Sequence, residues 1–238
     1  ADTVEIRIYS SPIAADAGPN QTLCITSALS MSANSTGAGI GTWTLISGPN
    51  VPVITNPNDE ASSITGLIAG IYVFRWTISN NLICADSYDE VQIEIFDLPS
   101  SAVVGSDQVL CDVFSISLSA NTPAIGTGTW SLVSGPNIPS IVSPGNATTT
   151  INGLEEGVYV FSWNISSGVC PASTANIQIS IDSLPTVAAA GSDQDICLNT
   201  AMNLIANNPS VGTGSWTFLN GPNVPVINSP NSPVASAT

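Results

Sequence analysis

Basic residues are almost absent from the sequence. Its 238 residues include no lysine, no histidine and only two arginines, Arg7 and Arg75, against 17 acidic residues, which gives a net charge of −15. Without a basic surface the chain cannot neutralise phosphate groups, so we expect no binding to nucleic acid or to an anionic membrane. Without an imidazole or a lysine amine it has no Ser-His-Asp centre, Cys-His centre or Schiff base, so we do not expect an enzyme.

Charged residues of either sign are also scarce. They make up 8% of the chain, whereas hydrophobic residues make up 43%, a fraction that excludes extended disorder. The sequence has no apolar run long enough to cross a membrane and does not begin with a signal peptide, so we expect no direct membrane insertion. The abundance of Val, Ile, Thr, Gly and Pro favours β-strands joined by turns.

Three short motifs recur along the chain at one spacing. They are G-x-x-Q-x-x-C, ending at Cys24, Cys111 and Cys197; G-[TS]-W, ending at Trp43, Trp130 and Trp216; and G-P-N-x-P, beginning at Gly48, Gly135 and Gly221. Each motif returns after 87 residues and then after 86 residues. A fixed period of this kind indicates tandem copies of one domain.

One aromatic stretch lies at the centre of each copy. Residues 70–84 read GIYVFRWTISNNLIC, and residues 157–170 read GVYVFSWNISSGVC. Large apolar residues occupy every second position, which is typical of a β-strand with one buried face. All five tryptophans occur at repeat-equivalent positions, so we predict that they belong to the core; the alternative is a platform for sugar rings.

Each copy contains about seven short strands separated by turn residues. In the first copy we expect them at residues 21–25, 29–33, 42–46, 52–55, 62–64, 71–79 and 90–96. This density of strands predicts immunoglobulin-like β-sandwiches of about 86 residues. Proline in the linkers, at Pro12, Pro99 and Pro185, stiffens the joints, so we expect the sandwiches to form a rod.

The repeats define the expected domain boundaries. Residues 1–9 resemble the last strand of a copy, residues 14–97 and 101–182 are two whole copies, and residues 187–238 are the first part of a third. Because both ends fall within the repeat pattern, we interpret the chain as a segment of a longer protein.

Cysteine gives the clearest site prediction. Each whole copy holds one pair at matching positions, so we predict the disulfides Cys24–Cys84 and Cys111–Cys170, with the partner of Cys197 outside the segment. Disulfides indicate an oxidising compartment outside the cytoplasm. The alternative is a pair of buried free thiols in each domain. A zinc site is disfavoured because the chain has no histidine and no C-x-x-C motif.

Carboxylates near the joints are candidates for a cofactor site. We predict none, although calcium between domains is an alternative to a solvated acidic surface. The carboxylates in question are Asp16, Asp97, Asp107, Asp182 and Asp193.

The motifs resemble the PKD-like or immunoglobulin-like repeats of very large surface proteins of Bacteroidota, including gliding-motility adhesins of the SprB type. The resemblance rests on ADAGPNQTLC (residues 15–24), VGSDQVLC (104–111) and AGSDQDIC (190–197), with the G-[TS]-W, GPN and G-x-Y-x-F-x-W motifs. It implies export by type IX secretion to the cell surface. It also implies O-glycosylation at Asp-Ser/Thr-apolar sites, for which Thr3 and Ser183 are candidates.

From these observations we expect a structural spacer in a long cell-surface adhesin filament, which bears load and projects a distal binding region. Its partners would be neighbouring repeats of the same polypeptide and other copies in a filament. One alternative is a fibre subunit that donates residues 1–9 to the open third domain of the next molecule. Another is a glycan- or protein-binding module, which predicts exposed aromatic residues or a groove in one repeat alone.

Overall fold

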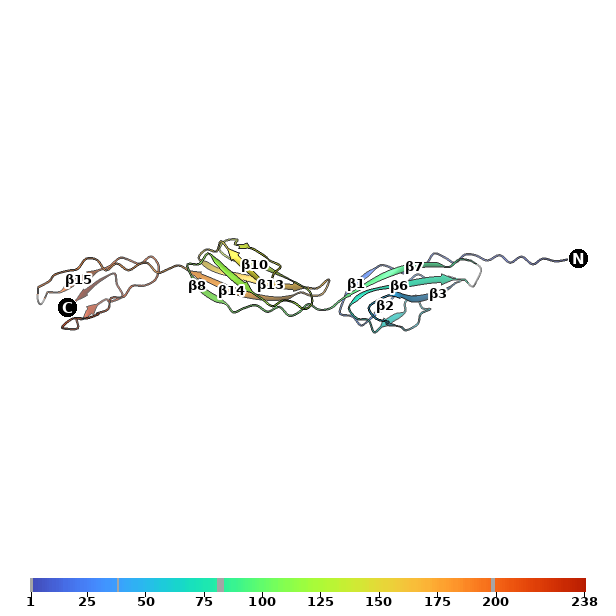
Figure 1. The fold of residues 1–238 in the computed structure, drawn as a ribbon, viewed down its shortest axis with the longest axis horizontal. Helices are drawn as coiled ribbons and strands as arrows, with labels where there is room; N and C mark the ends of the chain where they lie inside the picture. The colour runs from blue at the N-terminus through green and yellow to red at the C-terminus, as the bar shows by residue number, and fades with distance from the viewer. Residues whose placement is uncertain (1, 38, 81–83, 198–199) are drawn as a thin grey trace.

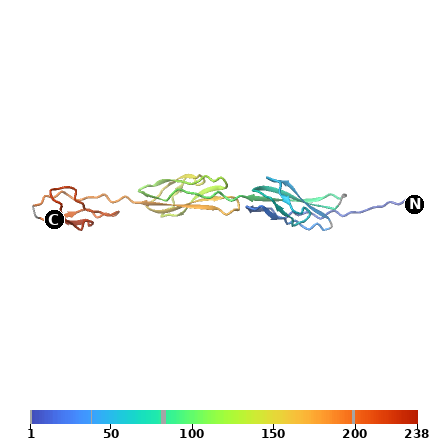
Figure 2. The same cartoon turned by 90° about the horizontal axis from the view of Figure 1, so that it is seen from below.

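The computed structural model describes residues 2–37, 39–80, 84–197 and 200–238. Within them every regular element is a β-strand, and there is no helix long and apolar enough to span a membrane. The strands form three groups that follow one another along a single axis (Figures 1 and 2). We call β1–β7 the first unit, β8–β14 the second unit and β15–β17 the third unit.

The first unit is a sandwich of two sheets. One sheet has the strand order β1-β7-β6-β3 and the other the order β2-β5-β4. The strands are β1 Gln21–Cys24, β2 Ala28–Ser30, β3 Ile40–Ser47, β4 Val53–Ile54, β5 Ser63–Thr65, β6 Gly70–Ser79 and β7 Ser87–Phe96. All seven lie where the sequence predicts them, although β7 begins three residues earlier.

The second unit repeats the same sandwich. Its sheets have the orders β10-β13-β14-β8 and β11-β12-β9. The strands are β8 Gln108–Cys111, β9 Ser115–Ser119, β10 Thr127–Ser134, β11 Ser140–Ile141, β12 Thr148–Asn152, β13 Gly157–Ser166 and β14 Ser173–Asp182. In both units the last strand pairs antiparallel with the aromatic strand and parallel with the first strand.

In its described part, the third unit contains a single three-stranded sheet. It consists of β15 Met202–Ile205, β16 Ile227–Asn228 and β17 Val234–Ala237, in the order β15-β17-β16. By the repeat spacing these strands correspond to β9, β11 and β12, which form the smaller sheet of the second unit. Residues 187–238 thus include no counterpart of the aromatic strand, and an open cavity of about 380 Å³ lies beside Trp216.

The aromatic strands β6 and β13 form the centre of each complete core. Tyr72, Phe74 and Trp76 are fully buried, and their counterparts in β13 are equally buried, which confirms the predicted alternation. Each tryptophan of these strands packs against the tryptophan of the G-[TS]-W motif, with ring centroids 5.1 Å apart in the first unit and 5.3 Å apart in the second. The four tryptophans of the complete units are therefore core residues.

The G-P-N motif holds the hydroxyl of the aromatic strand's tyrosine. In the second unit the Tyr159 hydroxyl donates to Asn137 Oδ1 at 2.5 Å and accepts from the Glu155 amide at 2.8 Å. The Asn137 side-chain amide also donates to the Gly153 carbonyl, at 2.8 Å. Tyr72 and Asn50 make the same contacts in the first unit. A tyrosine that reaches back to the backbone at this corner is a hallmark of immunoglobulin-type sandwiches.

We predict that Tyr159→Phe lowers the free energy of unfolding of the second unit by about 1 kcal/mol, because it leaves the Asn137 oxygen and the Glu155 amide, both part-buried at this contact, without their partner. Chemical denaturation monitored by tryptophan fluorescence measures the change. The exposed substitution Val158→Ala on the same strand is the control and should be close to neutral. Equal effects of the two variants would show that the hydroxyl contacts do not stabilise the fold.

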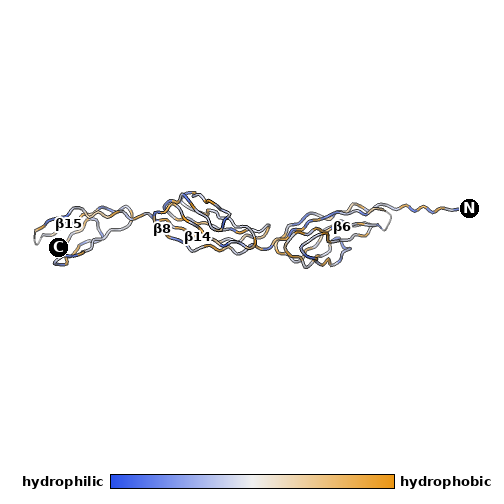
Figure 3. Tube along the Cα trace, viewed as in Figure 1, coloured by the Kyte–Doolittle hydropathy of each residue, from blue (hydrophilic) through white to orange (hydrophobic). Residues whose placement is uncertain are grey.

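The N-terminal segment, residues 2–9, has no strand partner among the described residues. Apolar and polar residues alternate along it (Figure 3), and Val4, Ile6 and Ile8 are 84%, 78% and 93% exposed. At the repeat spacing these positions correspond to Val91, Ile93 and Ile95, which are buried in β7. The segment thus carries the pattern of a last strand without a sandwich to cover it.

Candidate functional site

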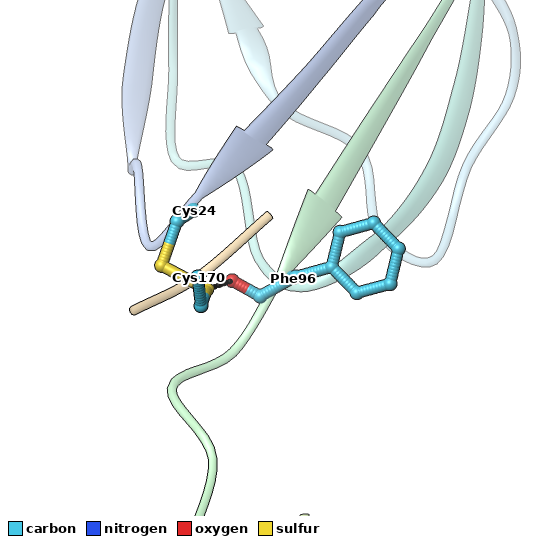
Figure 4. Close-up of a disulfide and its surroundings, with 3 residues drawn as sticks. All are labelled: Cys24, Phe96 and Cys170. Atoms are coloured by element: carbon cyan, nitrogen blue, oxygen red, sulfur yellow. Dashed lines mark hydrogen bonds between the residues drawn. A yellow bond between two sulfur atoms is a disulfide. The ribbon is translucent and has the colours of Figure 1, made fainter. Parts of the chain in front are cut away.

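A disulfide joins the first unit to the second. It links Cys24, the last residue of β1, to Cys170, which follows β13 (Figure 4). The two Cα atoms are 4.9 Å apart, although the cysteines are separated by 146 residues in the sequence. The linker between the units, residues 97–99, is therefore bridged by a second covalent connection.

This bond corrects the sequence prediction, because Cys24–Cys84 and Cys111–Cys170 were the expected pairs. Cys24 lies beside Phe96, at the C-terminal end of β7. Cys84 follows β6, which pairs antiparallel with β7 over nine residues, so it lies at the opposite end of the unit, ~30 Å away. A disulfide requires Cα atoms within about 7 Å. The two cysteines of one unit therefore cannot meet.

The second unit shows the same separation. Cys111 pairs in register with Asp182, at the end of β14 that adjoins the beginning of β13. Cys170 follows the end of β13 and so lies at the other end of the unit. Because the units are arranged end to end, Cys170 instead meets the end of the first unit.

A short turn seats Cys170 against the first unit. The Cys170 amide donates to the Ser167 carbonyl at 2.9 Å, and its sulfur lies 3.5 Å from the Phe96 carbonyl oxygen. Gly168, with φ of +49°, lies so close to the Phe96 ring that an added Cβ would be 2.3 Å from it. Glycine is therefore required here both by the left-handed backbone and by the contact with β7. Cys170 itself is 7% exposed.

The other three cysteines form no disulfide in the described residues. Cys84 is half-buried, and Cys111 and Cys197 are exposed. The Cys84 sulfur lies 3.8 Å from the Tyr9 carbonyl oxygen, at the junction between the N-terminal segment and the first unit. Cys197 lies outside any strand of the third unit.

An asparagine side chain fixes the segment that leads into each unit. Asn121 Oδ1 accepts from the Val103 amide at 2.8 Å, and Asn121 Nδ2 donates to the Ser101 carbonyl at 3.0 Å. Asn34 and Asn207 make the same pair of hydrogen bonds in the first and third units. These asparagines were not among the residues predicted from the sequence, although each follows an alanine at the repeat spacing of 87 and 86 residues.

A hydroxyl after the linker proline fixes the same segment in the second and third units. Ser100 Oγ accepts from the Ile125 amide at 2.9 Å, and Thr186 Oγ1 accepts from the Val211 amide at 2.9 Å. With the asparagine contacts, these bonds attach each linker to the unit that follows it. The joint is thus restrained by hydrogen bonds as well as by the disulfide.

We predict that Asn121→Ala removes the protection of the Val103 amide against hydrogen exchange, because that amide loses its acceptor. The loss of the two bonds should cost about 1–2 kcal/mol. The Asp16 amide, which Asn34 Oδ1 holds in the first unit, is the internal control and should keep its exchange rate. Unchanged protection at Val103 would contradict a role for Asn121 in fixing the linker.

The carboxylates near the joints do not gather. No group of three or more Asp, Glu, Cys or His side chains in the described parts of the chain is arranged to hold a metal ion. The Asp16 carboxylate accepts a hydrogen bond from the Gly18 amide, and the Asp107 carboxylate accepts one from the Gln178 amide. Both side chains are therefore bonded to the backbone. The alternative of calcium between domains therefore has no set of ligands among the described residues.

The candidate glycan acceptors lie in segments outside the strands. Thr3 is exposed in the N-terminal segment. Ser183 is half-buried, and its hydroxyl donates to Glu156. Glycosylation of either residue stays a prediction.

No protein-family model matches the chain, and no curated protein matches it. Among solved structures it is similar to the "I-band fragment I67-I69 from titin", with 12% identity, a TM-score of 0.52, and coverage of 96% of this chain and 88% of that one. A mutated variant of the same titin domains gives 10% identity with the same TM-score and coverage. The "PKD domain from KIAA 1837 protein" covers 40% of this chain and 95% of its own, with 20% identity and a TM-score of 0.32.

The fold is that of tandem immunoglobulin-like domains. The titin fragments match across nearly the whole length, so the likeness includes the serial arrangement of the units as well as the single sandwich. At 10–12% identity it concerns the fold alone. The immunoglobulin-like sandwich predicted from the strand density is confirmed.

Proposed function

We propose that the chain is a spacer that carries tension along its length and whose joint is closed by a covalent cross-link. The observation that carries this proposal is the Cys24–Cys170 disulfide between the first and second units. A binding pocket or catalytic group has no need of such a bond. A bond between the adjoining ends of two serial sandwiches restrains the joint and changes the route by which force passes through the chain.

The force route follows from the chain connectivity. Tension applied at the two ends passes along residues 1–24, crosses the disulfide to Cys170 and continues through β14. Strands β2 to β13 lie outside this route, and the load falls on β1 and β14, which pair with β7 and β13. Residues 25–169 cannot be drawn out while the disulfide is intact, even if a sandwich unfolds. The oxidised chain is therefore a spacer of limited extensibility.

We further propose that the protein works outside the cytoplasm, at a cell surface. A disulfide persists in oxidising compartments, and the acidic surface without lysine resists association with other acidic chains. The resemblance to SprB-type repeats supports a place in an adhesin filament exported by type IX secretion. In this proposal the domains are residues 14–97, 101–182 and 187–238, and residues 1–9 are the last strand of a further repeat.

A mechanical experiment tests the role, and a proteolytic one tests the location. When the oxidised chain is pulled between its ends, we expect no lengthening step that involves residues 25–169. When a protease that cannot enter cells is added to intact cells, we expect it to digest the protein. A full-length extension step under non-reducing conditions would overturn the mechanical role, and protection of the protein until lysis would overturn the location.

Strand donation between subunits is the second candidate, favoured by the exposed apolar residues of the N-terminal segment. In β7 the corresponding residues pair with β1 on one side and with the aromatic strand β6 on the other. Residues 187–238 supply no aromatic strand, and the N-terminal segment contains no tryptophan to pack on Trp216. A donated segment would therefore leave the cavity beside Trp216 unfilled, and so we prefer the spacer.

A glycan- or protein-binding module is less well supported. The four tryptophans of the complete units are buried, so they form no platform for a sugar ring. The exposed aromatic Tyr88 lies under the Arg75 guanidinium, 4.2 Å from the ring centroid, and is already covered on that face. Phe114 is a surface residue of the second unit, 66% exposed.

A further inference from the structure

Cys111 occupies the position in the second unit that Cys24 occupies in the first. Both end the first strand of their unit and pair in register with the end of the last strand, Cys24 with Phe96 and Cys111 with Asp182. The next residue in each case has a positive φ, and its amide donates at 2.9 Å to the carbonyl of that same strand-end residue. Cys111 thus has the same local geometry as a cysteine that forms a disulfide across a joint, and it is exposed.

Cys84 occupies the position in the first unit that Cys170 occupies in the second. Cys170 follows β13, and its sulfur lies 3.5 Å from the Phe96 carbonyl oxygen at the end of β7. Cys84 follows β6, and its sulfur lies 3.8 Å from the Tyr9 carbonyl oxygen. Tyr9 stands 87 residues before Phe96, at the equivalent end of the N-terminal segment. The Cys84 sulfur thus meets the end of the N-terminal segment as the Cys170 sulfur meets the end of β7.

We propose that Cys84 and Cys111 each form a disulfide with a cysteine of an adjoining unit of the same kind. Cys84 pairs with the cysteine that ends the first strand of the unit completed by residues 2–9. Cys111 pairs with the cysteine that follows the aromatic strand of a unit seated on the end of β14. The inference rests on the proposed role of the Cys24–Cys170 bond, which supplies the geometry for both pairs.

The consequence is a rod with one covalent bond across every joint. Each unit contributes one cysteine to the joint before it and one to the joint after it. In each new pair two thiols lose two protons and two electrons and form one S–S bond. An external disulfide accepts the electrons and protons and becomes two thiols, by thiol–disulfide exchange.

Differential alkylation of the protein isolated from its own cells tests the proposal. Free thiols are blocked with one reagent without reduction, and the remaining cysteines are then reduced and labelled with a second. Cleavage before aspartate suits this chain, since trypsin has only two arginines to cut at, and it leaves each of the five cysteines on a different peptide. We expect the second label on Cys84 and Cys111 as well as on Cys24 and Cys170.

The non-reduced digest identifies the partners. We expect the Cys84 peptide to be linked to a peptide whose sequence contains Q-x-x-C, and the Cys111 peptide to one whose cysteine follows an aromatic strand. Linkage within single chains places the partner unit in the same chain, and linkage seen only in multimers places it in a second copy. In both cases the partner cysteine occupies the same position of the repeat.

Two results would overturn the proposal, and they have different consequences for the proposed function. If Cys84 and Cys111 carry the first label while Cys24 and Cys170 carry the second, the cross-linked joint stands and its continuation fails. If the Cys24 peptide is linked to the Cys84 peptide, both fail. As a matched check, Cys84→Ser should abolish the linkage at its own joint and leave the Cys24–Cys170 peptide unchanged.

Discussion

Replacing both joint cysteines, in the double variant Cys24→Ser and Cys170→Ser, is expected to lengthen the fully extended chain by about 500 Å. The disulfide closes a loop of 146 residues, and an extended chain spans at most ~3.3–3.6 Å per residue. In the oxidised parent this length is excluded from the force route. Single-molecule pulling between the two ends measures the difference as added contour length.

The parent chain under reducing conditions is the matched control, since it should extend as far as the double variant. The single variant Cys111→Ser should extend no further than the oxidised parent, because Cys111 takes no part in this loop. If the oxidised parent and the double variant reach the same length, residues 25–169 are not protected and the proposed force route is wrong.

The second large effect is expected from a glycine of the G-[TS]-W motif. An added Cβ at Gly128 would lie 2.0 Å from Trp163, which is fully buried in the core of the second unit. The tryptophan cannot withdraw without opening the core. We predict that Gly128→Ala destabilises the second unit by at least about 2 kcal/mol. For a domain of this size that corresponds to a fall of roughly 10 °C or more in its melting temperature.

Gly145 provides the matched control because it lies in the same unit, in the turn between β11 and β12. An added Cβ there meets nothing within 4 Å. Gly145→Ala should therefore be neutral or slightly stabilising, since alanine restricts the unfolded chain. Differential scanning calorimetry of the two variants checks the contrast. Similar losses at both positions would show that the cost does not come from the packed tryptophan.

The sandwiches could be predicted from the sequence because their signals are local. Alternation in residues 70–79 and 157–166 marks the buried face of each aromatic strand, and glycine, proline and asparagine mark the turns between strands. Because each strand pattern occurs in more than one copy of the repeat, a strand with a weak pattern is supported by its counterpart. The core positions of four tryptophans followed from the same equivalence.

The joint could not be predicted in this way. Matching positions show that cysteines are equivalent, but they do not show whether a cysteine pairs within its own unit or with the next. That choice depends on strand direction: β7 runs parallel to β1 and antiparallel to β6, which places Cys24 and Cys84 at opposite ends of one sandwich. The asparagine contacts at Asn34, Asn121 and Asn207 were also missed, because an isolated A-N pair gives no local signal of structure.

The central claim is that Cys24 is bonded to Cys170 across the joint, and peptide mapping of the non-reduced chain tests it most directly. Cleavage before aspartate places Cys24 on residues 16–58, Cys84 on residues 59–85 and Cys170 on residues 112–181. We predict that residues 16–58 are recovered linked to residues 112–181. Recovery of residues 16–58 linked to residues 59–85 would contradict the cross-linked joint.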